Sequence, residues 1–192
     1  KMLHEVERNQ ASKKARSRVA TKMSDSFYSK FRGLVVLVNF TDRKFTRSDY
    51  KSVVTDMLNK ENYTGYTNTD GSANTYGSMF LGSVRDYFLE QSYGEFAVDF
   101  DVVGPYTLRS PYQYYGQNAN GKGDMNSKKM AWEAAQLADA DVDFSAYDWD
   151  GDGTVEHFYI IYAGYGENYA GNDPDYVWGH SASVMGLTGG KK

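Results

Sequence analysis

The residues best suited to chemistry lie in one acidic loop, DWDGDGTVE at positions 148–156. This loop brings four carboxylates into nine residues, and without a counter-charge they would repel one another at close range. A hard cation removes that repulsion, and alternating Asp residues with Gly at the sharp turn are how a calcium loop presents its oxygens. The spacing therefore predicts a calcium site with the ligands Asp148, Asp150, Asp152, Thr154 and Glu156.

The acidic loop matches only part of the twelve-residue calcium loop of helix–loop–helix proteins. Its Asp residues take the first, third and fifth positions, and Gly153 takes the sixth. Thr154 would offer its carbonyl at the seventh position, and Glu156 stands at the ninth. The twelfth position, normally a bidentate Glu, is Tyr159, and the residues around it are β-branched and aromatic. We therefore predict a calcium loop that leads into a strand; a solvated acidic turn without metal is the alternative.

The three histidines, His4, His157 and His180, do not form a recognisable catalytic motif. A zinc site needs about three protein ligands, and the sequence contains neither H-E-x-x-H nor H-x-H. It also contains no G-x-S-x-G elbow for a serine nucleophile. His157 stands in an apolar run and is predicted to be a hydrogen-bonded core residue, whereas His180 lies on a predicted edge strand. The residues alone thus indicate a calcium-stabilised module without a visible catalytic centre.

Seven predicted elements must position these groups. The continuous apolar run 33–40 predicts a central strand buried on both faces, and the apolar–polar alternation over 96–103 predicts a half-buried strand. Further strands are predicted at 155–163 and 176–185, and helices at 46–58, 83–94 and 125–140. The first helix is expected to begin with a capping-box-like start at Thr46 and Asp49, and the second to be capped by Ser83 and stopped at Gly94. Pro105 and Pro111 are expected to bracket a loop. The order β-α-α-β-α-β-β predicts an α/β fold, with a mixed twisted sheet of about four strands and backing helices.

Length, charge and composition limit the classes of protein. The 192 residues suit one domain of normal size, and the net charge of -4 predicts no nucleic-acid partner. Residues 1–32 hold nine Lys and Arg against three acids. We expect 1–30 to be a flexible basic leader, either a solvated tail or the remnant of a pro-segment, with ordered structure from Phe31. The longest apolar run, 34–38, is far too short to span a bilayer.

Five stretches, taken in order, resemble one family of enzymes. They are GLVVLVNFTD at 33–42, SVRDYFLEQSYG at 83–94, FSAYDWDGDGTVE at 144–156, AGYGE at 163–167 and VWGH at 177–180. Together they resemble the immune inhibitor A-type secreted zinc metallopeptidases, metallopeptidase family six. The resemblance covers about residues 31–185. The 17 Tyr and 19 Gly fit the extracytoplasmic location that it implies, and the absence of Cys does not exclude it.

This resemblance implies a zincin-like catalytic domain whose zinc-binding helix carries H-E-x-x-H and follows the strand that contains 177–180. Residues 31–192 would then be the N-terminal, upper subdomain, truncated before that helix and inactive alone. No catalytic residue or zinc ligand can therefore be placed on this chain. The resemblance also implies that the loop 148–156 is a structural calcium site. Four residues would form the edge that holds an extended peptide by main-chain hydrogen bonds, namely Trp178, Gly179, His180 and Ser181.

By the same resemblance, the function is proteolysis of protein substrates by a secreted, zinc-dependent endopeptidase. Zinc would polarise the scissile carbonyl and lower the pKa of its bound water. The implied partners are protein or peptide substrates and the missing C-terminal half of the catalytic domain, with no nucleic acid and no membrane span. The alternative is a non-catalytic calcium-binding module for adhesion or surface attachment, for which the Tyr-rich segments 62–76 and 112–118 would be exposed loops.

Overall fold

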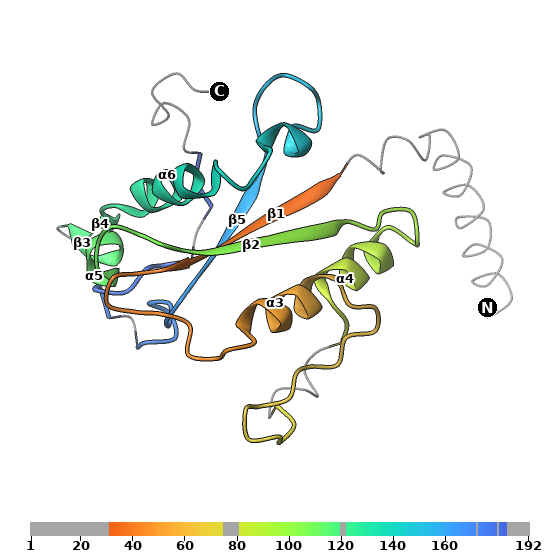
Figure 1. The fold of residues 1–192 in the computed structure, drawn as a ribbon, viewed down its shortest axis with the longest axis horizontal. Coiled ribbons are helices and arrows are strands. Elements are labelled where there is room, and N and C mark those ends of the chain that lie inside the picture. Colours follow the sequence, from red (N-terminus) through yellow and green to blue (C-terminus); the bar gives the residue numbers. More distant parts are fainter. Residues whose placement is uncertain (1–30, 75–80, 120–121, 172, 180, 184–192) are drawn as a thin grey trace, which may run out of the picture.

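The centre of the fold is a three-stranded sheet in which every pairing is parallel (Figure 1). In this sheet β1 (Arg32–Asn39) lies between β2 (Asp99–Thr107) and β5 (Phe158–Tyr162). The structure is a computed structural model, and it describes residues 31–74, 81–119, 122–171, 173–179 and 181–183. The predicted leader, 1–30, lies outside the described residues.

The strand β1 takes the central position because its residues are apolar on both faces. Residues 34–38 are all at most 1% exposed. Successive side chains of a strand point to opposite faces, so β1 contributes to two separate hydrophobic clusters. The even-numbered residues enter one cluster and the odd-numbered residues the other: Leu34, Val36 and Val38 against Val35 and Leu37. The prediction of a central strand buried on both faces is confirmed.

Helices cover both faces of the sheet (Figure 1). On one face lie α3 (Tyr50–Asn59) and α4 (Val84–Gln91), which pack on the odd-numbered side chains of β1. On the other face lie α5 (Tyr112–Gly116) and α6 (Ser127–Ala138), which pack on the even-numbered ones. The α/β class is therefore confirmed, as three layers with the sheet in the middle.

Three shorter elements complete the described structure. The strands β3 (Asn118–Ala119) and β4 (Lys122–Asp124) form an antiparallel hairpin after α5. The 3-10 helix η2 (Phe144–Tyr147) follows α6 and leads to the acidic loop. None of the described helices is long and apolar enough to cross a membrane.

The helix α4 begins where the sequence predicts, but α3 does not. A capping box opens α4, because the Ser83 hydroxyl accepts from the Asp86 amide and the Asp86 carboxylate accepts from the Ser83 amide. The N-cap of α3 is Asp49 and not Thr46, and its side chain makes no capping bond. Because α3 begins only at Tyr50, Asp49 is not at the third helical position that the predicted box requires, and its carboxylate instead accepts two hydrogen bonds from Arg47, of 2.9 and 2.8 Å.

The sheet differs from the predicted one in strand number and direction. The described part of the sheet has three strands, all parallel, and not about four in mixed directions. The fourth expected strand, 176–185, is not a strand over 176–179 and 181–183, and its remaining residues are not described. β2 continues through Pro105, where a loop was expected. Pro is tolerated there because β2 is an edge strand and its ladder with β1 is irregular beside Pro105.

We predict that Gly33→Ala destabilises the fold. Gly33 lies beside Phe100 on the neighbouring strand, and a Cβ at position 33 would lie 2.2 Å from Cδ1 of that buried ring. Overpacking of a filled core costs about 1 to 3 kcal/mol of unfolding free energy. Urea denaturation should show this loss, while Gly123→Ala, whose Cβ would meet nothing within 4 Å, should leave the midpoint near that of the wild type. Equal midpoints for the two variants would contradict this account of the packing.

Candidate metal centre and the adjoining peptide segment

The acidic loop lies between η2 and β5, and its carboxylates converge. Single oxygen atoms of Asp148, Asp150 and Glu156 lie within 4.8 Å of one another. Asp150 is exposed and the other two are half-buried. None of the three forms a salt bridge with a described Lys or Arg. The loop therefore concentrates negative charge without a protein counter-charge among the described residues, and its oxygens suit a hard cation such as calcium.

Backbone amides hold the loop in shape. The Asp148 carboxylate accepts from the Gly151 amide at 2.7 Å through Oδ1 and from the Gly153 amide at 2.8 Å through Oδ2. Both glycines have a positive φ, 80° and 86°, a conformation that other residues rarely adopt. Asp152 accepts from the Thr154 amide at 2.7 Å and does not belong to the converging group of three carboxylates. The predicted turn at Gly153 and a second turn at Gly151 thus bring three of the four predicted carboxylates together.

Trp149 ties the acidic loop to the beginning of the sheet. Its backbone amide donates to Oε2 of Glu156 at 3.0 Å, and its indole N–H donates to the Arg32 carbonyl at 3.1 Å. Its ring packs edge-on against Phe31, with centroids 4.9 Å apart, and lies 5.9 Å from the ring of His157. Trp149 therefore links Glu156 to the first residues of β1.

The prediction for His157 was wrong. His157 is exposed, and the strand begins one residue later at Phe158. Because β5 pairs only with β1 among the described strands, its start is not enclosed by a second neighbour. His157 is the one described histidine and does not belong to the converging carboxylate group, while His4 and His180 lie outside the described residues. The described residues therefore do not fit a zinc centre, and no zinc ligand is assigned to them.

The second predicted site, 178–181, begins next to a tightly held residue. Val177 is 1% exposed, whereas Trp178, Gly179 and Ser181 are exposed. The Val177 amide donates to the Tyr112 hydroxyl at 2.9 Å, and the Val177 carbonyl accepts from the Tyr162 hydroxyl at 3.1 Å. Side chains thus hold this segment in place of a β-ladder. Tyr162 is the last residue of β5, so this segment is anchored at the opposite end of the strand from the acidic loop.

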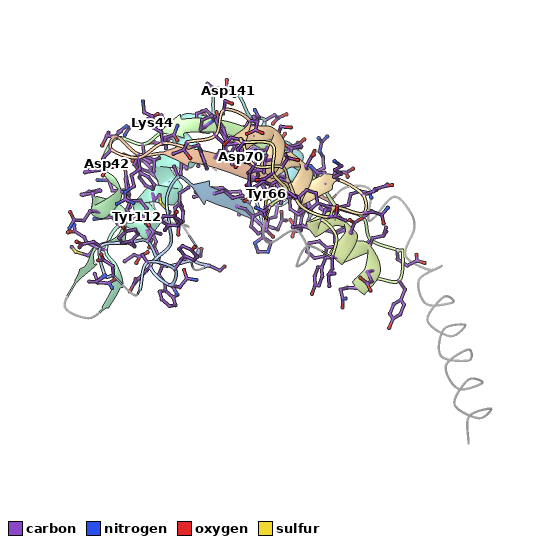
Figure 2. All side chains as sticks on the ribbon, turned by 90° about the horizontal axis from the view of Figure 1, so that it is seen from below. Asp42, Lys44, Tyr66, Asp70, Tyr112 and Asp141 are labelled. Carbon is purple, nitrogen blue, oxygen red and sulfur yellow. The ribbon has the colours of Figure 1, made fainter. Side chains whose placement is uncertain are left out.

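The hydroxyls of Tyr112 and Tyr162 hold this segment, although 112–118 was considered as an exposed loop. Tyr112 and Tyr115 are at most 1% exposed, so 112–118 is not the exposed loop that surface attachment would need. The Tyr112 amide donates to Asp42 at 2.8 Å, and Figure 2 shows both residues at the same end of the molecule. The one signal of this core role in the sequence was the density of tyrosines, with three Tyr in 112–115.

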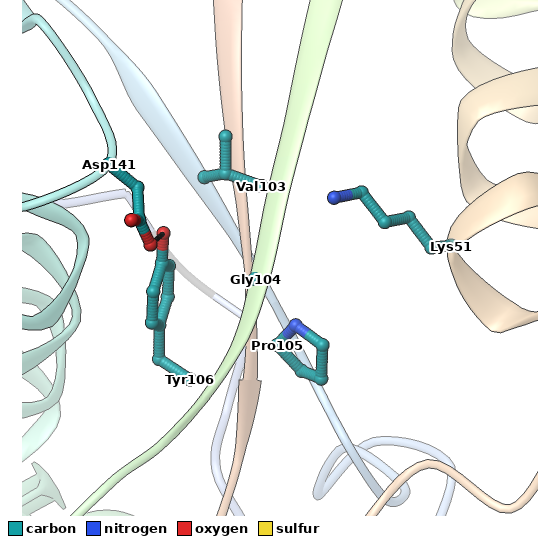
Figure 3. Close-up of a pocket in the computed structure, with 6 residues that line it drawn as sticks. All are labelled: Lys51, Val103, Gly104, Pro105, Tyr106 and Asp141. Carbon is teal, nitrogen blue, oxygen red and sulfur yellow. Dashed lines mark hydrogen bonds between the residues drawn. The ribbon is translucent and has the colours of Figure 1, made fainter.

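A shallow hollow of about 380 Å³ over β2 is separate from both candidate sites (Figure 3). It is lined by Lys51, Val103, Gly104, Pro105, Tyr106 and Asp141. The Tyr106 hydroxyl donates to the Asp141 carboxylate at 2.9 Å, and Lys51 approaches from α3 on the other side of the strand. A single satisfied Tyr–Asp pair and one lysine do not form a nucleophile, a base or a metal site.

We predict that alkaline pH unfolds the domain over a defined interval. Burial is the largest of the causes that raise the pKa of four tyrosines to about 12: Tyr106, Tyr112, Tyr115 and Tyr147. Unfolded tyrosine ionises near pH 10, so their stabilisation is complete below about pH 10 and is lost as the pH rises toward about 12. Urea midpoints should fall across this interval, and absorbance at 295 nm should show these phenols ionising together with unfolding. A midpoint that stays constant to pH 12 would refute the prediction.

Comparison with known proteins places the chain in a family. The chain matches the family described as immune inhibitor A peptidase M6, catalytic domain, over residues 20–192. It is 28% identical over 171 residues to the pre-pro-metalloprotease PrtV of Vibrio cholerae serotype O1 (strain M66-2). This alignment covers 77% of this chain and 18% of that protein. It is 27% identical over 173 residues to immune inhibitor A of Bacillus thuringiensis subsp. alesti, and this alignment covers 79% of this chain and 25% of that protein. The match thus covers about a fifth to a quarter of each relative, and this chain belongs to the immune inhibitor A peptidase M6 family.

Proposed function

We propose that this chain is part of a secreted, zinc-dependent endopeptidase that cleaves protein substrates, and that it carries a structural calcium site. The observation that carries the proposal is the match to the catalytic domain of a peptidase family over residues 20–192. The similarity to a metalloprotease of Vibrio cholerae and to immune inhibitor A of Bacillus thuringiensis supports it. In this proposal residues 31–192 form the upper subdomain of a zincin-like domain, and 1–30 form a leader or pro-segment remnant.

The zinc ligands of the proposed peptidase are assigned outside this chain. No described histidine joins the converging carboxylates, and the sequence has no H-E-x-x-H. The C-terminal half of the catalytic domain would therefore be the first partner of this segment, and protein or peptide substrates the second. Sequencing the roughly 60 codons that follow Lys192, about the length of a half-domain, tests this. A helical H-E-x-x-H is expected there, and its absence from the reading frame would overturn the proposal.

Calcium would act at a distance from the chemistry. Asp148, Asp150 and Glu156 would hold the ion, with Asp152 and the Thr154 carbonyl as the remaining proposed ligands. Because Trp149 bonds to both Glu156 and the Arg32 carbonyl, the ion would fix the loop against the start of the central strand. Its contribution is stability of the sheet.

The segment 178–181 would hold the substrate. Exposed Trp178, Gly179 and Ser181 follow the anchored Val177, and an exposed segment with a fixed start can accept main-chain hydrogen bonds from an extended peptide. His180 belongs to this proposed set but lies outside the described residues. The alternative of a non-catalytic surface-binding module loses support, because the tyrosines at 112 and 115 are buried.

We predict that calcium stabilises the chain through the acidic loop. At calcium concentrations about 100 times the dissociation constant, binding adds about 2.7 kcal/mol, or a rise of about 5 to 10 °C in melting temperature. Asp150→Ala should abolish the rise. Asp70→Ala is the matched control, because Asp70 also forms an exposed turn, accepting from the Ser72 amide at 2.9 Å. An undiminished rise in the Asp150 variant would move the calcium site elsewhere.

We also predict that the 192-residue chain alone does not cleave casein, even with added zinc. The physical reason is the lack of a helical pair of histidines with a general-base Glu in the sequence. A fluorescent casein assay with and without a zinc chelator measures this, with the natural protein as the positive control. Cleavage by the isolated chain that the chelator blocks would show that its own residues bind the catalytic metal.

A further inference from the structure

Groups from four other parts of the chain fix the backbone at Val177 and Trp178. The Val177 amide donates to Tyr112 of α5, and its carbonyl accepts from Tyr162 of β5, at 2.9 and 3.1 Å. The Glu167 amide also donates to the Val177 carbonyl at 3.0 Å. The Trp178 amide donates to Oδ2 of Asp124, on β4, at 3.0 Å. Three consecutive main-chain groups are thus engaged by the protein itself before any ligand binds.

The cradle, defined as Tyr112, Gly116, Asp124 and Tyr162, also fits the segment sterically. Gly116 ends α5, and a Cβ there would lie 2.5 Å from both the Tyr176 carbonyl carbon and the Val177 nitrogen. The peptide bond between these two residues therefore lies directly on the Gly116 backbone. At Gly179, two residues beyond the anchored Val177, a Cβ would meet nothing within 4 Å. The segment is thus closely packed at Val177 and has open space beside it at Gly179.

At neutral pH the two tyrosines of the cradle carry the protons that their hydrogen bonds require. Burial raises the pKa of Tyr112 to about 12, and burial followed by the nearby Asp124 charge raises the pKa of Tyr162. Both phenols therefore remain neutral and keep the hydroxyl hydrogen that they donate. Tyr112 uses it on the Tyr165 carbonyl at 2.5 Å while it accepts from Val177. Asp124 contributes a charged acceptor, which makes a stronger bond than a neutral one.

We propose that Asp124 and Tyr162 are positioning residues that set the register of substrate binding. This inference rests on the proposed peptidase function. Because the polar groups of Val177 and the Trp178 amide are already bonded, an extended substrate peptide takes its main-chain hydrogen bonds from the residues after the Trp178 amide. Asp124 and Tyr162 touch no substrate. Tyr162 holds Val177 and Asp124 holds Trp178, so together they fix the start of the binding segment.

The experiment compares peptide cleavage by variants of the natural protein. Asp124→Ala removes the acceptor of the Trp178 amide, and Asp124→Asn keeps an acceptor oxygen of the same shape. Tyr162→Phe removes only the oxygen atom that bonds the Val177 carbonyl. Tyr106→Phe and Asp141→Ala are the matched controls, because this pair makes one similar bond of 2.9 Å at the hollow over β2. KM and kcat are measured with fluorogenic peptides of increasing length.

We expect the substrate-binding constants to change while the chemical step does not. Loss of a bond that positions substrate equally in the ground and transition states raises KM and leaves kcat unchanged. Asp124→Ala should raise KM about tenfold and Tyr162→Phe about fivefold, the sizes expected for one charged and one neutral hydrogen bond. Asp124→Asn should restore KM to within about twofold of the wild type. Both control variants should keep the wild-type KM.

Three results separate this inference from the function on which it rests. An active wild-type protein whose KM is unchanged in both Tyr162→Phe and Asp124→Ala overturns the positioning role alone. A fall in kcat at constant KM also overturns it. A natural protein that cleaves no peptide or protein overturns the peptidase function, and this inference with it. If Asp124→Ala does not fold, Tyr162→Phe decides the question, since it deletes one atom at a half-buried position.

Discussion

The whole structure depends on the burial of β1 from both sides. A buried backbone must have its N–H and C=O groups paired, so an apolar central strand requires a neighbour on each edge. Parallel neighbours require long crossover connections, and here these contain the helices that cover the two faces of the sheet. The same arrangement leaves β2 and β5 as the outer described strands. The candidate sites are found at the two ends of β5 because loops, and not strand partners, surround it there.

The acidic loop and the segment after Val177 are related through β5 but solve different physical problems. At the N-terminal end of the strand, converging carboxylates lack a described counter-charge, and two glycines with positive φ allow the backbone to turn beneath them. At the C-terminal end, a buried backbone without a strand partner is satisfied by Tyr112, Tyr162 and Asp124. The first arrangement favours a cation, and the second favours a backbone fixed in position. Only five strand residues, roughly 13 Å of chain, separate them.

Local sequence rules succeeded where the neighbours of a residue in the chain are also its partners in space. The Ser83 cap of α4 and the Gly153 turn of the acidic loop are of this kind. The rules failed where a distant or competing group took over. The helix α3 began after the expected Thr46–Asp49 box, whose carboxylate binds Arg47 instead, and an edge position allowed β2 to continue through Pro105. The tyrosines of 112–115 resembled a polar loop until the sheet and α6 enclosed two of them.

The sequence by itself determined the α/β class, the buried central strand, the acidic loop and the family resemblance, because each depends on the pattern of nearby residues. Tertiary structure alone decided that the described sheet is parallel, that His157 is exposed and that Asp152 stands apart from the converging carboxylates. It also decided that Asp124 and Tyr162 hold the segment after β5. These features depend on how residues that are far apart in the chain lie in space. Their geometry is set by how the helices pack on the sheet, which no local spacing encodes.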